Sequence, residues 1–391
     1  MSLLTSQAAH RAYSHRPADE SYPTLAAMID AAKDEKNRSA EKTYNLRDLR
    51  AVAVSNAAPL TPGACNDTDH SGPPTIQLES PKGRANFTHW SFGQLARTIG
   101  APAWYLRDLP PTIAVQAINH GLHDDPSTTG TSANLLIRLP NGDPTPTIRA
   151  ATSESYGRLW DSDLYSAIDR YVVQAGSSDQ GSGAGKWELP PTWEGGADGP
   201  RKGAYRGDRD SFLILTNGGS IVNDPSASAG NGSPGGTMFR GIMVRNSEVG
   251  AAAITIETIL FRYICGNHML WGAIADKQFR RRHVGTRVLR DTIREIGTIA
   301  YRWTNRGASA DEAIIRSLID HEIAHTKEAV IDELKAMGAT KAQAEAAYLL
   351  CEQHENASPR SFWGAAQGLT RLSQAEEYTD ARYLLDKIAS L

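Results

Sequence analysis

The sequence predicts an α+β protein in which a mixed or antiparallel sheet is flanked by helices and followed by a C-terminal all-helical region. Strand-like runs cluster in the middle of the chain and do not alternate regularly with helices. Helical periodicity of apolar residues dominates from about residue 277 onward. A chain of 391 residues also has enough apolar surface for about two or three structural units without a disulfide or structural metal.

The first 45 residues are polar and mixed in charge, with one short amphipathic stretch at residues 25–29. We expect residues 1–45 to form a flexible N-terminal arm, because so few apolar side chains do not anchor a segment to a core. The predicted α+β core domain spans residues 46–275, and the C-terminal helical region spans residues 276–391.

The first half of the core domain opens with a predicted strand at residues 49–54, where apolar and polar side chains alternate. Residues 87–122 carry apolar side chains at helical spacing, interrupted by glycine and proline, which predicts three short helices. Residues 134–151 then contain two strand-like runs on either side of Asn141 and Gly142, which is a strong β-hairpin signal.

Two stretches of the second half are rich in Gly, Ser, Pro and Asp, at residues 176–209 and 224–237. Neither buries enough apolar surface to offset its ordering entropy, so we expect both to be long loops inserted into the core domain. Strand-like runs lie between and after them, at residues 211–215, 239–245 and 253–262. The last two flank a predicted hairpin turn at residues 246–250.

Composition excludes several classes of protein. The 41 Lys and Arg residues against 44 Asp and Glu give a net charge of -3, so a nucleic-acid site would have to be local. Three widely spaced cysteines are typical of a reducing cytoplasm, not of a disulfide framework or a zinc ribbon. No apolar run approaches a membrane span and the N-terminus lacks a signal-peptide h-region, so we expect a cytoplasmic protein with no membrane partner.

Several segments resemble a known family by their order and spacing across residues 85–290, about half of the chain. The segments are residues 92–97, 101–106, 152–156, 160–161, 208–212, 240–250, 261–267 and 282–283. On these residues the chain resembles the phage- and plasmid-associated family catalogued as domain of unknown function nine hundred and thirty-two. The resemblance implies a product of a mobile element, often encoded near recombination functions, and it carries no established chemistry.

The most localised charge feature lies at residues 276–306, which carry nine Lys and Arg residues against three Asp and Glu, a local net charge of +6. If the segment is helical, four arginines recur at helical offsets and fall close to one face: Arg280, Arg287, Arg290 and Arg294. Such a face suits contact with a phosphate backbone, because the guanidinium group binds phosphate through two parallel hydrogen bonds.

We expect nucleic-acid contacts from Lys277, Arg280, Arg281, Arg282, Arg287 and Arg290. In the adjacent turn, Asn267 and Trp271 would supply hydrogen bonds and a stacking surface for exposed bases. The alternative is self-neutralisation. From residue 307 onward fourteen carboxylates outnumber eight Lys and Arg residues, so this acidic tail could pair with the basic segment.

Residues 321–325 read His-Glu-Ile-Ala-His and match the HExxH pattern of zinc hydrolases. On a helix, His321 and His325 would lie one turn apart and bind one zinc ion, while Glu322 activates its water. Glu345, Glu352 or His354 on the following predicted helix would be available as a third ligand. The alternative is a surface helix with two solvated histidines, since nothing in the sequence resembles the longer metalloprotease motifs.

The leading hypothesis is a non-catalytic, sequence-independent nucleic-acid-binding protein of phage or plasmid origin. Single-stranded DNA is its favoured partner, bound or annealed in recombination, and the hypothesis needs no cofactor and is compatible with a homo-oligomer. Two alternatives stay open. One is a zinc-dependent hydrolase with Glu322 as its catalytic residue, and the other is a structural or interaction protein that acts through its helical tail.

Overall fold

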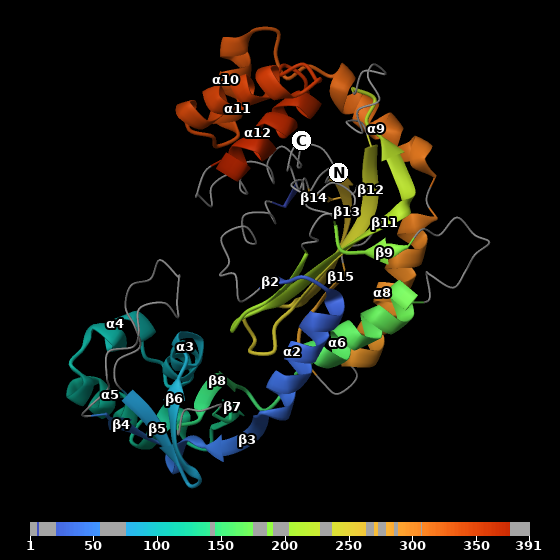
Figure 1. Cartoon of the computed structure of the whole chain (residues 1–391). Coiled ribbons are helices and arrows are strands. Elements are labelled where there is room, and N and C mark those ends of the chain that lie inside the picture. The colour runs from blue at the N-terminus through green and yellow to red at the C-terminus, as the bar shows by residue number, and fades with distance from the viewer. Residues whose placement is uncertain are drawn as a thin grey trace.

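The structure is a computed structural model, and it describes residues 6–7, 21–54, 76–140, 145–174, 186–190, 203–226, 237–262, 270–272, 279–284, 288–305 and 307–375. These residues form two sheets and a group of C-terminal helices (Figure 1). The small sheet lies at one end of the molecule, the C-terminal helices lie at the other, and the large sheet lies between them. The fold belongs to the α+β class and ends in a helical region, as predicted.

The small sheet has the strand order β3-β7-β8-β6-β5-β4. Its strands are β3 (Ser39–Asn45), β4 (Arg50–Ala53), β5 (Ile76–Ser80), β6 (Gly83–Phe87), β7 (Ser132–Arg138) and β8 (Thr147–Thr152). Neighbouring strands are antiparallel except β6 and β8, which are parallel. The antiparallel pairing of β7 with β8 confirms the predicted hairpin, although its turn residues Asn141 and Gly142 lie outside the described residues.

Three short helices pack against the small sheet: α3 (His89–Thr98), α4 (Ala103–Asp108) and α5 (Pro111–His123). Thr88 and Ser91 form a capping box that begins α3, and Pro111 occupies the first turn of α5. Phe92 and Ile118 from these helices are fully buried against the sheet. Short 3₁₀ turns, η2 (Leu46–Asp48) and η3 (Pro126–Thr128), complete this end of the molecule.

The N-terminal segment is not a free arm over the residues that the structure describes. Residues 25–37 form α2 (Leu25–Asn37), and Met28, Ile29 and Ala32 on it are buried. This helix packs against α6 (Asp161–Ile168), which is distant in sequence. The prediction of a flexible arm at residues 1–45 is therefore wrong from α2 onward. The short apolar stripe of α2 packs against α6, and no local sequence pattern indicates that contact.

The large sheet has the strand order β1-β14-β13-β12-β11-β10-β2, with β15 added to β13 and β9 added to β11, and all of these pairs are antiparallel. Its strands are β1 (Ser6–Gln7), β2 (Ser21–Tyr22), β9 (Trp187–Glu188), β10 (Ala204–Arg206), β11 (Ser211–Asn223), β12 (Thr237–Asn246), β13 (Ile254–Arg262), β14 (Leu270–Gly272) and β15 (Phe279–Arg281). The three predicted strands correspond to β11, β12 and β13. In contrast, β9 and β10 are ordered strands inside the predicted loop at residues 176–209.

Helices cover one face of the large sheet: α6, its continuation η4 (Asp169–Gln174) and α8 (Val288–Thr304) (Figure 1). Leu213, Ile242 and Ile256 point into this helix-covered core, since they alternate with residues of the opposite face. Ile214 and Met243 belong to the separate apolar cluster on that opposite face.

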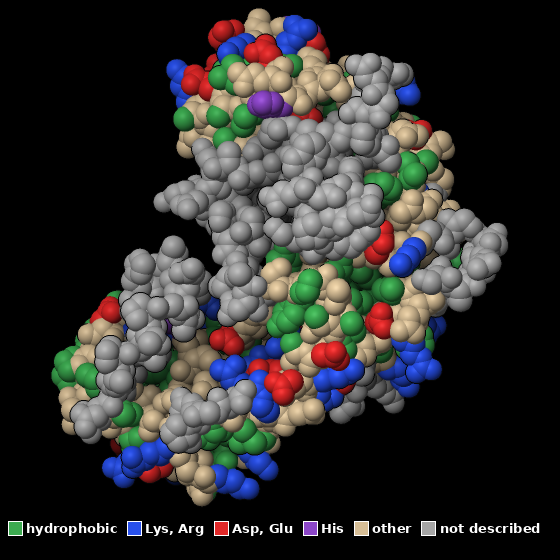
Figure 2. Space-filling model, in the orientation of Figure 1, with side chains coloured by type: hydrophobic (Ala, Val, Ile, Leu, Met, Phe, Trp, Pro, Cys, Tyr) green, Lys and Arg blue, Asp and Glu red, His purple; other side chains and the backbone are tan. Residues whose placement is uncertain are grey.

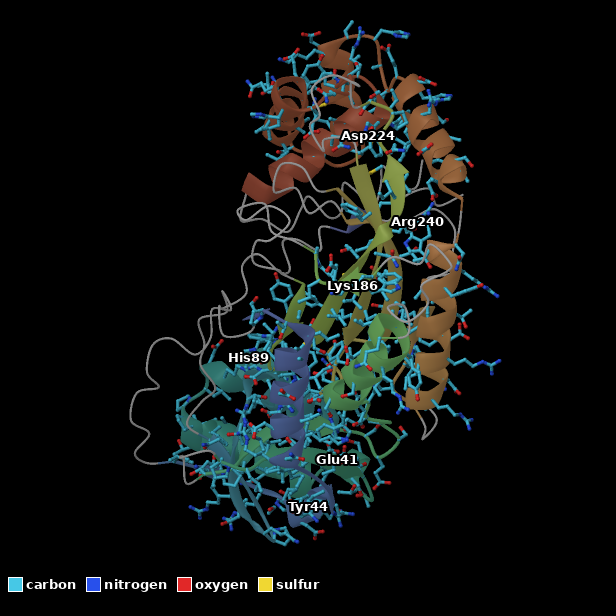
Figure 3. The ribbon with its side chains drawn as sticks, turned by 45° about the vertical axis from the view of Figure 1, so that its right-hand side comes forward. Glu41, Tyr44, His89, Lys186, Asp224 and Arg240 are labelled. Atoms are coloured by element: carbon cyan, nitrogen blue, oxygen red, sulfur yellow. The ribbon has the colours of Figure 1, made fainter. Side chains whose placement is uncertain are left out.

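Arg240 of β12 ties the large sheet to the C-terminal helices and is labelled in Figure 3. Its side chain is 2% exposed, pairs with Asp311 and lies over the ring of Trp303, 5.0 Å from the ring centroid. Burial of a charge is tolerated here because a carboxylate neutralises it and Ser220 adds a hydrogen bond.

The C-terminal helices are α9 (Ala308–Asp320), α10 (Lys327–Ala336), α11 (Lys341–His354) and α12 (Phe362–Ala375). The last three share an apolar core of their own, which includes Leu334, Ala347 and Leu369. The helical region therefore begins with α8, later than the predicted residue 276. Within the described residues, no helix combines the length and the apolar character needed to cross a membrane.

Candidate nucleic-acid interface

The predicted basic helix consists of two different elements. Residues 279–281 form β15, which pairs with β13, and α8 begins only at Val288. The prediction that Arg280 and Arg290 share one helical face is therefore wrong. The physical reason is Phe279, whose side chain packs against the core of the large sheet while its backbone extends that sheet.

Strand geometry separates the arginines of this segment, because successive side chains point to opposite faces. Arg281 contacts α8, where its Nη1 atom lies 2.8 Å from Oδ2 of Asp291. Arg280 therefore projects from the other face of the sheet, and both Arg280 and Arg282 are exposed. Arg290 on α8 is exposed, with its Nε atom 3.8 Å from Oδ1 of the same Asp291.

Of the remaining predicted contacts, the structure describes the backbone of Trp271. Lys277, Arg287 and Asn267 lie outside the described residues. Trp271 lies on β14, where its backbone pairs with Leu260 of β13, and so it is part of the sheet and not of a turn.

The solvent-facing side of α8 carries a row of arginines. We name Arg290, Arg294 and Arg302 the arginine row; with Thr298 they occupy every fourth position of the helix, so they lie on one side of it. On the opposite side of α8, Ile296, Ala300 and Trp303 are buried in the core. Figure 2 shows Lys and Arg side chains gathered over this part of the molecule. Arg294 and Arg302 are exposed and have no carboxylate partner among the residues that the structure describes.

The acidic tail pairs elsewhere in its described part. Glu322 lies 3.3 Å from Arg360, and Asp332 lies 2.8 Å from Lys335, so both carboxylates are paired within the C-terminal helices. Among the described residues, the arginine row has its ion pair with Asp291, which lies on α8 itself. In the described residues, the protein's own carboxylates therefore neutralise only part of the charge of the arginine row, and they do so from α8 itself.

An open hollow of about 520 Å³ lies between α8 and η4. Tyr301 of α8 and Tyr171 of η4 line it, and they are 71% and 54% exposed. Arg294 and Arg302 of the arginine row also line it, so aromatic and cationic groups converge there. The Cζ atom of Arg170 lies 5.4 Å from the centroid of the Tyr171 ring and adds a further cation.

Sequence reasoning missed the two tyrosines. A signal for Tyr301 was present, because it follows Arg294 by seven positions and therefore lies on the same side of an amphipathic helix. No comparable signal existed for Tyr171. It comes from η4, more than a hundred positions earlier in the chain, and only tertiary packing brings it beside α8.

Segments behind the family resemblance converge at a different place, the joint between the two sheets. The tip of the β12–β13 hairpin inserts into the small-sheet unit, where Val249 packs against Leu136. The backbone oxygen of Val249 accepts hydrogen bonds from Trp90 Nε1 at 3.0 Å and from Gln94 Nε2 at 2.7 Å. Tyr156 donates its hydroxyl to the oxygen of Ser247 at 2.8 Å.

Glu248, at the same tip, is the centre of a buried ionic cluster. It is 2% exposed, and its Oε2 atom lies 2.9 Å from Nη1 of Arg149 and 3.2 Å from Nη2 of Arg206. Burial opposes ionisation, but Arg206 and Arg149 hold the pKa of Glu248 below its ordinary value. The carboxylate therefore bridges an arginine of the small sheet and an arginine of the large sheet.

Asp161 extends this cluster at the start of α6. It accepts hydrogen bonds from Ser211 at 2.6 Å and from Asn246 at 2.7 Å, and it lies 3.1 Å from Arg206. Burial, together with the neighbouring charge of Glu248, raises the pKa of Asp161 to about 6. Each of these side chains is at most 9% exposed, so the arrangement stabilises the joint and offers little access to a ligand.

His283 closes one side of the joint. Its ring is 5% exposed and stacks on Tyr156, with ring centroids 5.1 Å apart. Burial lowers the pKa of His283 to about 4, and the nearby Arg158 acts in the same direction, while the backbones of Gly157 and Ala252 oppose it.

Acidification should therefore weaken the protein through His283. Between pH 6.5 and 4 the unfolded histidine binds a proton that the folded one does not, so the free energy of unfolding falls as the pH falls. From pH 7 to pH 5 we expect wild type to lose about 2 kcal/mol relative to His283→Phe, which keeps the stacked ring without titrating. Urea denaturation of both proteins at several pH values measures this difference.

Asp161 acts in the opposite direction, because its raised pKa makes the folded state take up a proton first as the pH falls. It is present in both proteins, so its contribution cancels in the comparison. Parallel stability curves for wild type and His283→Phe would contradict a buried neutral histidine.

The HExxH segment is not helical, which corrects the prediction. α9 ends at Asp320, and Glu322 forms an isolated antiparallel bridge with Ser361. α10 starts only after Thr326, whose side chain caps its N-terminus by accepting from Ala329 N at 3.2 Å. The segment is a short link between helices, held to the α11–α12 connection.

Its histidines are therefore not one helical turn apart on a common face. His321 Nδ1 lies 2.7 Å from the oxygen of Ser317, and His325 Nδ1 lies 2.9 Å from Oε2 of Glu322. Glu345 on α11 lies 3.8 Å from Lys341. Across the part of the chain that the structure describes, no group of three or more His, Cys, Asp and Glu side chains is placed to hold a metal ion.

Comparisons of the chain with models of protein families, with curated proteins and with solved structures found no match. The resemblance to a phage- and plasmid-associated family stays a prediction from the sequence.

Proposed function

We propose that this protein binds nucleic acid, with single-stranded DNA as its favoured partner, through the arginine row of α8. The observation that carries the proposal is the exposed pair Arg294 and Arg302, which lack a carboxylate partner among the described residues and flank two exposed tyrosines. Guanidinium groups contact phosphate, and exposed aromatic rings stack on bases irrespective of sequence. Binding of this kind is non-catalytic and independent of sequence.

The neighbourhood of the arginine row supports a moderate electrostatic attraction. α8 carries Arg290, Arg294 and Arg302 against Asp291 and Glu295. The neighbouring η4 adds Arg170 and Asp169, and Arg281 pairs with Asp291. Because the chain as a whole carries a net charge of -3, attraction of phosphate has to depend on such a local surface.

The proposed role is that of a phage- or plasmid-derived protein of the cytoplasm that binds or anneals single strands during recombination. The sequence resemblance supports this context, and the arginine row supports the mode of contact. A homo-oligomer would repeat the row along a strand, which suits sequence-independent binding.

Charge reversal of the arginine row tests the function. Arg294→Glu combined with Arg302→Glu should weaken binding of a fluorescein-labelled single-stranded oligonucleotide at least about tenfold, because two attractive interactions with phosphates become repulsive. The slope of log K against log salt should also become shallower by about 1.4, because each of the two phosphates that the variant no longer binds contributes about 0.7. Fluorescence anisotropy over a salt series measures both quantities.

The matched control is Arg97→Glu combined with Arg316→Glu, two exposed arginines on α3 and α9 that change the total charge equally. We expect this control to leave the salt slope unchanged. An equal loss in both double variants would mean that only total charge matters, and binding that does not depend on salt would remove the phosphate-contact mode.

A further inference from the structure

α8 contains a glycine that its packing does not require. Gly297 lies in the interior of the helix, where glycine is less favourable than alanine. Among the residues that the structure describes, a Cβ atom added there would meet no atom of another element within 4 Å, so close approach of a described element does not explain it. Its surroundings are the open hollow between α8 and η4, of which it forms part of the lining.

The missing side chain leaves that hollow open. Ile293, Gly297 and Tyr301 follow one another at four-residue steps along α8 and so lie on one side of the helix, beside the arginine row. A large residue in the middle position would occupy the space between the other two. The hollow is open to solvent, so a flat group could enter it from outside and lie against the side chains that line it.

We propose that this hollow is a subsite for one unpaired nucleobase, with Tyr171 and Tyr301 as stacking surfaces and Gly297 as the opening that admits the base. The inference rests on the proposed function and names the chemical group that the site takes. Arg294 and Arg302 line the same hollow and would hold the phosphates on either side of the base. A base inside a duplex is stacked and paired, so the subsite selects single strands.

The exposed tyrosines support a stacking role over a structural one. Tyr301 is 71% exposed and Tyr171 is 54% exposed, so neither ring contributes much to the core. Stacking on a base would bury both rings and needs no recognition of a particular base, since every base has an aromatic face.

Two oligonucleotides of equal length separate base stacking from phosphate binding: a fluorescein-labelled oligothymidylate, and an abasic strand with the same phosphates and no bases. Wild type should bind oligothymidylate at least about fivefold more tightly than the abasic strand. Gly297→Leu, which fills the hollow, and Tyr301→Ala, which removes a stacking surface, should abolish this preference. Both variants should keep the affinity of wild type for the abasic strand.

Matched controls are Gly297→Ala and Tyr301→Phe, which leave the hollow open and the aromatic ring in place, and which should keep the preference. The subsite is overturned if wild type does not distinguish the two strands, or if Gly297→Leu, folded by circular dichroism, still does. If wild type binds neither strand, the proposed function fails, and the subsite fails with it. The double variant Arg294→Glu with Arg302→Glu should lose binding to both strands. That loss would identify the two arginines as phosphate-binding residues, independently of base stacking.

Discussion

Replacing Glu248 by alanine should lower the free energy of unfolding by about 3–5 kcal/mol, the cost typical of removing one partner from a buried ion cluster. Arg149 and Arg206 would then lose the carboxylate that lies 2.9 Å and 3.2 Å from them. The backbone nitrogen of Asp161 would also lose its acceptor, since it donates to Glu248 at 2.9 Å. Urea denaturation followed by circular dichroism measures the change.

A matched control is available beside the same joint. Glu154 is exposed on the loop that precedes Tyr156, so Glu154→Ala should change the free energy of unfolding by less than about 0.5 kcal/mol. Glu248→Gln keeps the shape of the side chain and removes its charge, and it should fall between the two. A loss below about 1 kcal/mol for Glu248→Ala would mean that packing of Val249, not the ion cluster, holds the two sheets together.

The substitution Gly368→Ala, which adds one methyl group, should lower the free energy of unfolding by about 3 kcal/mol. This value is at the upper end of the usual range for overpacking. A Cβ atom there would lie 2.0 Å from the backbone oxygen of Ala347 on the facing helix. Because a backbone atom does not rotate away as a side chain does, α11 and α12 would have to move apart. That movement would open the apolar core around Leu369.

The same substitution at Gly297 provides the control. Gly297→Ala places its methyl group where no other described element lies within 4 Å, and it removes a helix-interior glycine, so it should stabilise the protein by up to about 1 kcal/mol. Thermal and urea denaturation of both variants compares one chemical change in two environments. Equal effects at Gly368 and Gly297 would contradict the close approach of α11 to α12.

Local sequence patterns predicted the helices and strands that are determined by near neighbours. The alternation in residues 211–215 and 253–262 indicated strands, and β11 and β13 are found there. The turn signal at residues 246–250 marked the β12–β13 tip, but nothing local indicated that this tip enters another sheet. A carboxylate at the end of a hairpin, such as Glu248, is ordinarily solvated, and its burial depends on Arg149 from β8.

The errors have a common cause in the distant partners of short segments. The basic segment was predicted as one helix because its arginines have helical offsets, yet Phe279 is drawn into the sheet core and turns the first part into β15. The HExxH segment was predicted to be helical because apolar residues recur at helical spacing on both sides of it. The bridge of Glu322 with Ser361 and the N-cap at Thr326 nevertheless end one helix and begin the next.

Periodicity and turn residues by themselves determined the α+β class and the helical C-terminal region, since both follow from contacts between near neighbours in the chain. The concentration of arginine after the long hairpin is read directly from the sequence. Only the tertiary structure decided which arginines meet carboxylates and which meet solvent. It also decided that Tyr171 lies beside Tyr301. The physical reason is that burial and ion pairing depend on surfaces far apart in sequence, and the energy of a charge is set by what lies next to it after folding.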